Sequence, residues 1–268
     1  MSAASASASA PGSASSTDVD ALVAQYALQL GDDALILSHR LSEWCAHAPE
    51  LEEDVALANL ALDLLGQART LLTYAGSLEG RGRSEDDLAF LRTEREFRNV
   101  LLVEQPNGDF AVTIARQLYF ATYQGELYAA LCGSTDSVLA GLAAKAVKEV
   151  AYHRDHAVQW TLRLGDGTAE SHRRMRDGLE LLWPYTAELF SADPVASALV
   201  EAGVAVDPRT LRPAWEASIA AVLEMATLTV PTGSWQPRGG REGMHTEGFG
   251  LLVGEMQALH RQIPGARW

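Results

Sequence analysis

The stretch LGDDALILSHRLSEWCAHAPELEEDVALANLALDLLGQAR, residues 30–69, holds two apolar patterns of helical period on either side of a proline. Pro49 follows a short Ala-His-Ala turn, and proline is favoured where a new helix begins. Acidic residues fill the next turn, where the helix dipole favours negative charge. We therefore predict two antiparallel helices, over residues 18–46 and from Pro49 to about Tyr74. Apolar residues of the first recur at spacings of three, four and seven: Leu22, Tyr26, Leu30, Leu37, Leu41 and Trp44.

The rest of the chain continues the helical pattern, with capping residues such as Asp109 and Thr168 before several apolar stripes. A Gly- and Pro-rich segment, residues 232–248, interrupts it, and no alternating stretch predicts a strand. We predict an all-α fold, an antiparallel helix bundle with additional packed helices, as one domain over residues 18–268 after a disordered tail, residues 1–17. The later helices are expected at about residues 84–99, 109–132, 136–165, 168–190 (interrupted at Pro184), 207–230 (broken near Pro213) and 247–262.

Charge and composition narrow the functional class. The 268-residue chain has 21 basic residues against 35 acidic ones, a formal net charge of −14, which argues against a nucleic-acid partner. Cys45 and Cys132 lack the spacing of a zinc site and the density of a disulfide scaffold, which favours a reduced, cytoplasmic location. Residues 1–17 do not resemble a signal peptide, and no stretch approaches the roughly 18 apolar residues of a membrane span. We expect a soluble protein with no membrane partner.

Bundles of this length can hold a di-iron centre, built from one carboxylate on each of two helices and Glu-x-x-His on each of the other two. The one Glu-x-x-His of the chain, Glu242 to His245, lies in the Gly-rich segment. We therefore interpret these two residues as a loop acid and a surface or capping histidine, in a loop held by Trp235 against the bundle or a partner chain. The glycines there lack the pattern of a phosphate-binding loop, and the chain has no Gly-x-Ser-x-Gly elbow.

Several long strings resemble one known family. They are residues 30–69, quoted above, LLVEQPNGDF (101–110), AKAVKEVAYH (144–153), AVDPRTLRPAWEA (205–217) and GMHTEGFGLLVGEMQALHRQIPGARW (243–268). Together they resemble the C subunits of bacterial phenylacetyl-CoA epoxidases. The resemblance implies a ferritin-like fold and membership of a multicomponent monooxygenase of phenylacetate degradation, with further subunits and a reductase as possible partners. In that family a related catalytic A subunit holds the di-iron centre, and the C subunit is its structural partner.

The resemblance also locates the metal-ligand positions. Two antiparallel helices joined at Pro49 bring Ala34 opposite Leu64. In the catalytic relative a Glu and a Glu-x-x-His match these positions, and equivalent ligands match the fourth and fifth helices. A dication needs several oxygen ligands, so we expect no catalytic residues, no metal and no cofactor in this chain, with di-iron in the partner subunit. The matching residues here are Ala34, Leu64, Gln67, Ala121, Val150 and His153, of which His153 alone is of a ligand type.

The sequence is also compatible with two alternatives. A shifted register could build a carboxylate site, which would make the chain a self-sufficient di-iron or di-manganese oxidase; its ligands would be Asp63, Glu126, Glu149 and His153. Otherwise we expect Asp63 and Glu149 to be buried acids paired with Arg or Lys, and Glu126 and His156 to face solvent or a partner. A helical interaction module unrelated to oxygenases would account for the helices but not for the long strings. Because residues 55–62 are apolar on almost every face, we also expect a partner to cover part of that helix.

Overall fold

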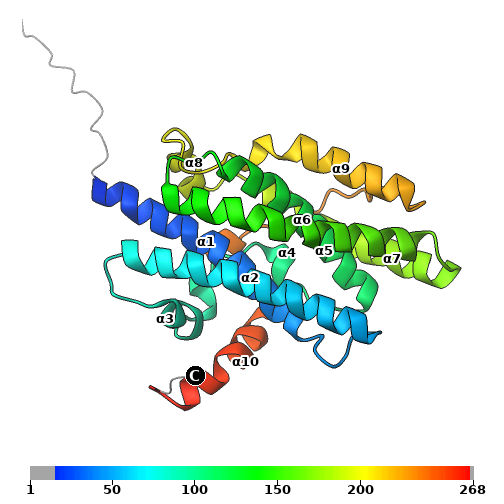
Figure 1. The fold of residues 1–268 in the computed structure, drawn as a ribbon, viewed down its shortest axis with the longest axis horizontal. Helices are drawn as coiled ribbons and strands as arrows, with labels where there is room; N and C mark the ends of the chain where they lie inside the picture. The colour runs from blue at the N-terminus through cyan, green and yellow to red at the C-terminus, as the bar shows by residue number, and fades with distance from the viewer. Residues whose placement is uncertain (1–15, 266–268) are drawn as a thin grey trace, which may run out of the picture.

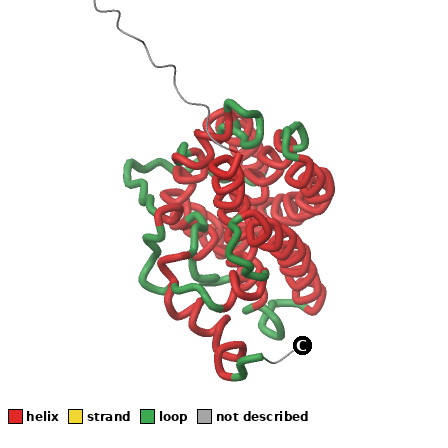
Figure 2. Tube along the Cα trace, turned by 90° about the vertical axis from the view of Figure 1, so that its left-hand side faces the viewer, coloured by secondary structure: helices red, strands yellow, loops and turns green. Residues whose placement is uncertain are grey.

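The computed structural model describes residues 16–265. The predicted tail, residues 1–17, lies outside them except for its last two residues, with which the first helix begins. In Figure 1 the long helices lie alongside one another as two packed pairs, and Figure 2 shows helices and loops without a strand in the described part. The all-α, ferritin-like antiparallel bundle is therefore confirmed. Its long helices are α1 (Ser16–Ser42), α2 (Leu51–Leu78), α5 (Phe110–Leu131) and α6 (Ser137–Gly165).

Shorter helices pack around these four, as the sequence predicts. α7 and α9 pack against α5 and α6, while α3 and α10 lie together on the side of α2 in Figure 1. The α-helices are α3 (Glu85–Phe90), α4 (Leu101–Glu104), α7 (Ala169–Leu182), α8 (Pro194–Val200), α9 (Arg212–Met225) and α10 (Phe249–Gln262); the 3-10 helices are η1 (Glu94–Glu96), η2 (Trp183–Phe190), η3 (Pro208–Thr210) and η4 (Gly240–Glu242).

The helices differ from the predicted ones in several places. The helix expected over residues 84–99 ends at Phe90, because the chain beyond it extends so that the amides of Arg98 and Val100 bond to carboxylates of α1. α8 was not predicted, although Asp193 caps it through the Val195 and Ala196 amides. The break predicted near Pro213 is present: η3 ends at Thr210 and α9 begins at Arg212, so that Pro213 stands in the first turn of α9, where its missing N–H is not needed.

The α1–α2 pair has the register that the sequence predicts. The Ser38 hydroxyl donates to the Ala61 carbonyl at 2.7 Å, about one turn from the level of Ala34 and Leu64, and both of these side chains are fully buried. Gly31 does not mark a break in α1; its lack of a side chain lets α2 approach, since a Cβ there would stand 3.0 Å from the Leu72 side chain. This close contact fixes which residues of α2 point into the bundle.

α2 differs from the other helices in its outward face. Among the described residues it is the one helix long and apolar enough to cross a membrane by length and composition, a test that core helices of soluble proteins also pass. Four large apolar side chains of α2 are exposed along a single stripe, and they are Leu51, Val55, Leu62 and Leu65, with exposed fractions of 76%, 55%, 63% and 46%. The predicted all-round apolar character of α2 therefore includes surface that this chain alone does not bury.

Candidate functional site

The six positions that the resemblance assigns to metal ligands are all buried within the bundle. Each is at most 4% exposed, so the interior that could enclose a metal is filled by these side chains. Four of these side chains are hydrocarbon: Ala34 on α1, Leu64 on α2, Ala121 on α5 and Val150 on α6. None of these four can donate an electron pair to a metal ion. The residues at these positions are therefore buried and mainly hydrocarbon, and their match to metal ligands of the family stays a prediction.

Gln67 forms the polar link across this centre. Its Nε2 donates to Glu149 Oε2 at 3.0 Å, and its Oε1 accepts from the Tyr128 hydroxyl at 3.2 Å. Burial raises the pKa of Tyr128 above its usual range, so the phenol keeps the proton that it donates. Lys145 Nζ lies 3.3 Å from the other oxygen of Glu149. The amide of Gln67 thus accepts a hydrogen bond from a phenol and donates one to a carboxylate. These two bonds join α2, α5 and α6.

His153 is also engaged. Its Nε2 lies 3.1 Å from Asp63 Oδ2, with the histidine side chain 1% exposed and the aspartate 39% exposed. Burial lowers the pKa of His153 below its ordinary value of 6.5, although Asp63 acts in the opposite direction. The imidazole is therefore neutral near pH 7, and because a carboxylate only accepts, its Nε2–H donates to Asp63. One turn away, His156 Nε2 lies 2.8 Å from Glu53 Oε2, and both side chains are largely buried.

The shifted set of candidate ligands divides into separate contacts. Asp63 and His153 form one pair, while Glu149 bonds to Gln67 and Lys145. Glu126 is half-buried and makes no hydrogen bond or ion pair with the described residues. Within residues 16–265 no three His, Cys, Asp or Glu side chains are grouped so that they could hold a metal ion. Whether the chain takes up metal is a matter for measurement and stays a prediction.

Some interpretations of individual side chains need correction. Asp63 is partly exposed and pairs with a histidine rather than with Arg or Lys, because His153 reaches it from α6. His156 does not face solvent, since Glu53 holds it inside. Trp235 does not hold the Gly-rich loop inside the bundle, since it is 63% exposed and lies at the edge, with 5.8 Å between its ring centroid and that of Tyr185; a contact of Trp235 with a partner chain stays a prediction.

The Gly-rich loop is instead held by buried charges, which were not predicted from the sequence. Glu188 accepts the amides of Gly239 and Gly240 through one oxygen and that of Leu101 through the other, at 2.6 to 2.9 Å. Glu104 accepts from His245 Nδ1 at 2.7 Å, from Asn99, and from both the amide and the hydroxyl of Thr246. His245 is thus not a surface histidine, and Glu242, on the exposed side of η4, does not share a site with it. We call the following residues the anchor network: Asp33, Glu104, Glu188, Arg241 and His245.

Arg241 joins the loop to α1. Its guanidinium donates to both oxygens of Asp33, at 3.0 and 2.7 Å, and to the carbonyls of Gln29 and Arg98. Burial raises the pKa of Asp33 to about 6, and Arg241 limits this rise. The signal in the sequence was the pair Asp32-Asp33 inside the apolar stripe of α1, since acids at buried helical positions require partners. Asp32 finds its own partner in Arg92, and both side chains are at most 2% exposed.

The fold and the site together define a class: a ferritin-like helix bundle whose central positions are hydrocarbon and paired polar groups. The chain belongs to the phenylacetic acid catabolic protein family, which matches residues 6–268. It is 54% identical over 243 residues to the C subunit of the 1,2-phenylacetyl-CoA epoxidase of Escherichia coli (strain K12), and the aligned part covers 91% of this chain and 98% of that protein. The resemblance inferred from the sequence strings is confirmed.

Proposed function

We propose that this chain is the non-catalytic C-type subunit of a cytoplasmic phenylacetyl-CoA epoxidase, in which it binds and supports the catalytic di-iron subunit. The observation that carries the proposal is the filled centre of the bundle. Ala34, Leu64 and Val150 stand fully buried at positions that match metal ligands in the catalytic relative. The remaining polar groups there already have partners. The likeness to the C subunit of an epoxidase indicates which reaction the supported catalytic subunit carries out.

The exposed stripe of α2 supports the structural role. Leu51, Val55, Leu62 and Leu65 lie within a narrow arc of the helix, at spacings of four, seven and three residues, with solvent on them in the isolated chain. Contiguous exposed apolar surface of this kind is typical of protein interfaces. We propose that this stripe contacts the catalytic subunit, as part of an interface of the obligate type, which commonly buries more than about 2,000 Å².

Metal analysis separates this proposal from a self-sufficient di-iron or di-manganese oxidase. The purified full-length chain, reconstituted anaerobically with iron or manganese and desalted, is expected to retain no stoichiometric metal, because too few oxygen ligands meet at any point. Two metal ions per chain, lost in Glu149→Ala or His153→Ala, would overturn the proposal and establish the oxidase.

Co-purification tests the association. The chain and the candidate catalytic subunit are co-expressed, sized, and assayed for epoxidation of phenylacetyl-CoA together and separately; activity is expected only from preparations that contain the catalytic subunit, and highest from the complex. Leu62→Glu should abolish co-purification, because it places a charge in the apolar stripe. Leu181→Glu on α7 is the matched control, since Leu181 is 59% exposed and Leu62 is 63% exposed. Equal co-purification of both variants would exclude the α2 stripe as the interface.

A further inference from the structure

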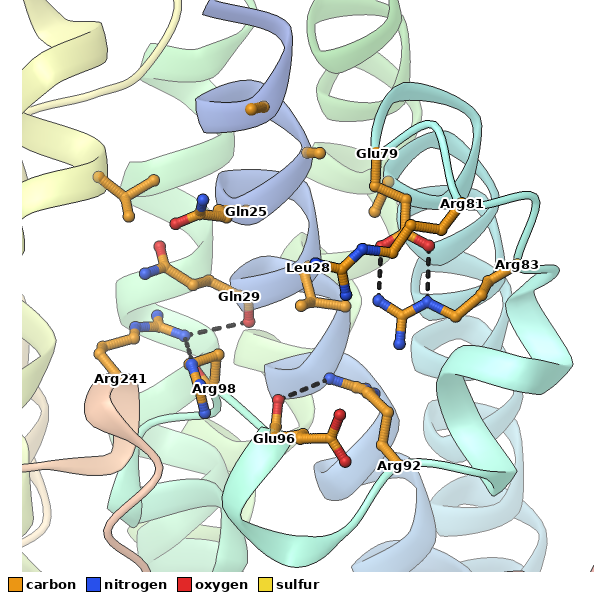
Figure 3. A pocket seen from close by; sticks show the side chains of 14 residues that line it. Gln25, Leu28, Gln29, Glu79, Arg81, Arg83, Arg92, Glu96, Arg98 and Arg241 are labelled. Atoms are coloured by element: carbon orange, nitrogen blue, oxygen red, sulfur yellow. Dashed lines mark hydrogen bonds and ion pairs between the residues drawn. The ribbon is translucent and has the colours of Figure 1, made fainter. Parts of the chain in front are cut away.

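A pocket rich in arginine lies away from the centre of the bundle. It has a volume of about 370 Å³ and is enclosed by the first half of α1, the end of α2 and its following loop, the segment around η1, and η4. Figure 3 shows guanidinium groups on several sides of it, reaching inward from separate elements. Its lining also includes the small apolar residues Ala21, Ala24 and Ala75 of α1 and α2. The arginines that line it are Arg81, Arg83, Arg92, Arg98 and Arg241.

Three of these arginines are committed to structural ion pairs. Arg92 pairs with Asp32 and Arg241 with Asp33, and Arg83 holds Glu79 on the rim at 2.5 Å. Their charges are balanced locally, so they shape the pocket and leave little net attraction for a ligand. The same ion pairs hold the guanidinium groups of Arg83, Arg92 and Arg241 in place.

Arg81 and Arg98 are different. Arg81 makes no hydrogen bond or ion pair within residues 16–265, and in Figure 3 its side chain extends across the pocket toward Leu28. Arg98 donates to the main-chain carbonyls of Arg95 and Phe97 but has no carboxylate partner in the described part of the chain. Glu96, the remaining acid of the lining, uses one of its oxygens to cap η1 through Thr93. Two positive charges thus lack an acid partner in a chain whose net charge is −14.

We propose that this pocket binds a phosphorylated small molecule, with a phosphate group held by Arg81 and Arg98. Planar guanidiniums recognise phosphate through paired hydrogen bonds, and a guanidinium with free donors is suited to it. A volume of about 370 Å³ is within the range of small-molecule sites and admits a nucleotide phosphate group with part of its sugar or base. Two sources share this chemistry, a free nucleotide diphosphate and the phosphoadenosine end of coenzyme A. The pocket is independent of the proposed function, and only the choice of coenzyme A as a probe rests on it.

Calorimetric titration of the full-length chain at low ionic strength tests the proposal with four probes: inorganic pyrophosphate, ADP, coenzyme A and dephospho-coenzyme A. Saturable binding of at least one probe is expected, weakened about tenfold or more by Arg81→Glu. Arg98→Gln should weaken it in the same sense. Arg238→Glu is the control, since Arg238 is exposed, lies outside the pocket and undergoes the same charge change. This variant should change the affinity less than about twofold.

The pattern across the probes identifies the source. Equal affinity for pyrophosphate, ADP and coenzyme A assigns the site to a diphosphate, whereas preference for coenzyme A over its dephospho form assigns it to the 3′-phosphate. The proposal is overturned if no probe binds saturably. It is also overturned if Arg81→Glu and Arg238→Glu weaken binding equally, because binding would then depend on general charge attraction and not on the pocket. Circular dichroism checks that each variant is folded. Co-purification with the catalytic subunit is scored separately, so failure of the pocket and failure of the proposed function are distinguishable.

Discussion

Two polar regions inside this molecule differ in how deeply they bury charged side chains. At the centre of the bundle the buried positions are hydrocarbon, an amide and one imidazole, and the acids nearby sit toward the edge, as with Asp63, whose side chain is 39% exposed. In the anchor network the acids are deeper, and Glu104 is fully buried. The difference is the supply of donors: Glu104 receives four hydrogen bonds, most of them from a segment about 140 residues away. Burial of a carboxylate in this fold therefore depends on the donors that another segment brings to it.

The largest effect is expected from removing a donor of the anchor network. Arg241→Met leaves Asp33 buried without its cation, and breaking one side of a buried pair costs about 3–5 kcal/mol. Because burial already raises the pKa of Asp33 to about 6, the folded variant holds the proton more tightly than the unfolded chain does. Its stability should therefore fall, and the gap to the parent should widen, as pH rises from about 5 to 8. Chemical denaturation at several pH values measures both.

Arg212→Met is the control for this change, since Arg212 and Glu216 form an ion pair at the surface with side chains 52% and 48% exposed. Arg212→Met should lower the free energy of unfolding by less than about 1 kcal/mol. If both variants lost the same stability, the distinction drawn between buried and exposed charge would be incorrect.

The second effect tests the hydrocarbon centre. Leu64→Glu places a carboxylate at a fully buried position with no donor arranged for it, which should destabilise the fold by about 2–4 kcal/mol without creating a metal site. Leu62→Glu, two residues away on the exposed stripe, should leave the melting temperature of the isolated chain nearly unchanged. A variant Leu64→Glu that melts like the parent, or that gains bound iron, would show that the centre tolerates charge as the anchor network does.

The smallest effect concerns His153. Because burial lowers the pKa of His153, the unfolded chain binds more protons than the folded one between that lowered pKa and the ordinary 6.5. Stability should thus fall as the pH drops below about 6.5, by up to about 1 kcal/mol from this residue. In His153→Gln this part of the fall should disappear, whereas His47→Gln, in an exposed turn, should keep it. If the stability of the parent and of His153→Gln fell equally at acid pH, His153 would not contribute to the fall.

The sequence predicted the long helices because their apolar period and their caps are local signals. The register of Ala34 against Leu64 also followed from local geometry, since the turn at Pro49 sets it. The end of α3 at Phe90 could not be predicted in this way, because acids of α1 draw the following chain into an extended course. The anchor network was missed for the same reason: its partners are far apart in sequence, and a Gly-rich segment with no helical period gives no sign of where its side chains end.

The contact between Asp33 and Arg241 spans 208 residues of chain. During synthesis α1 is therefore made 208 residues before the cation that Asp33 requires. Until then an acid lies on the face of α1 that must become core. This contact therefore closes late in folding: α1 reaches its native electrostatic environment only when the segment around η4 has been made and folds back over it.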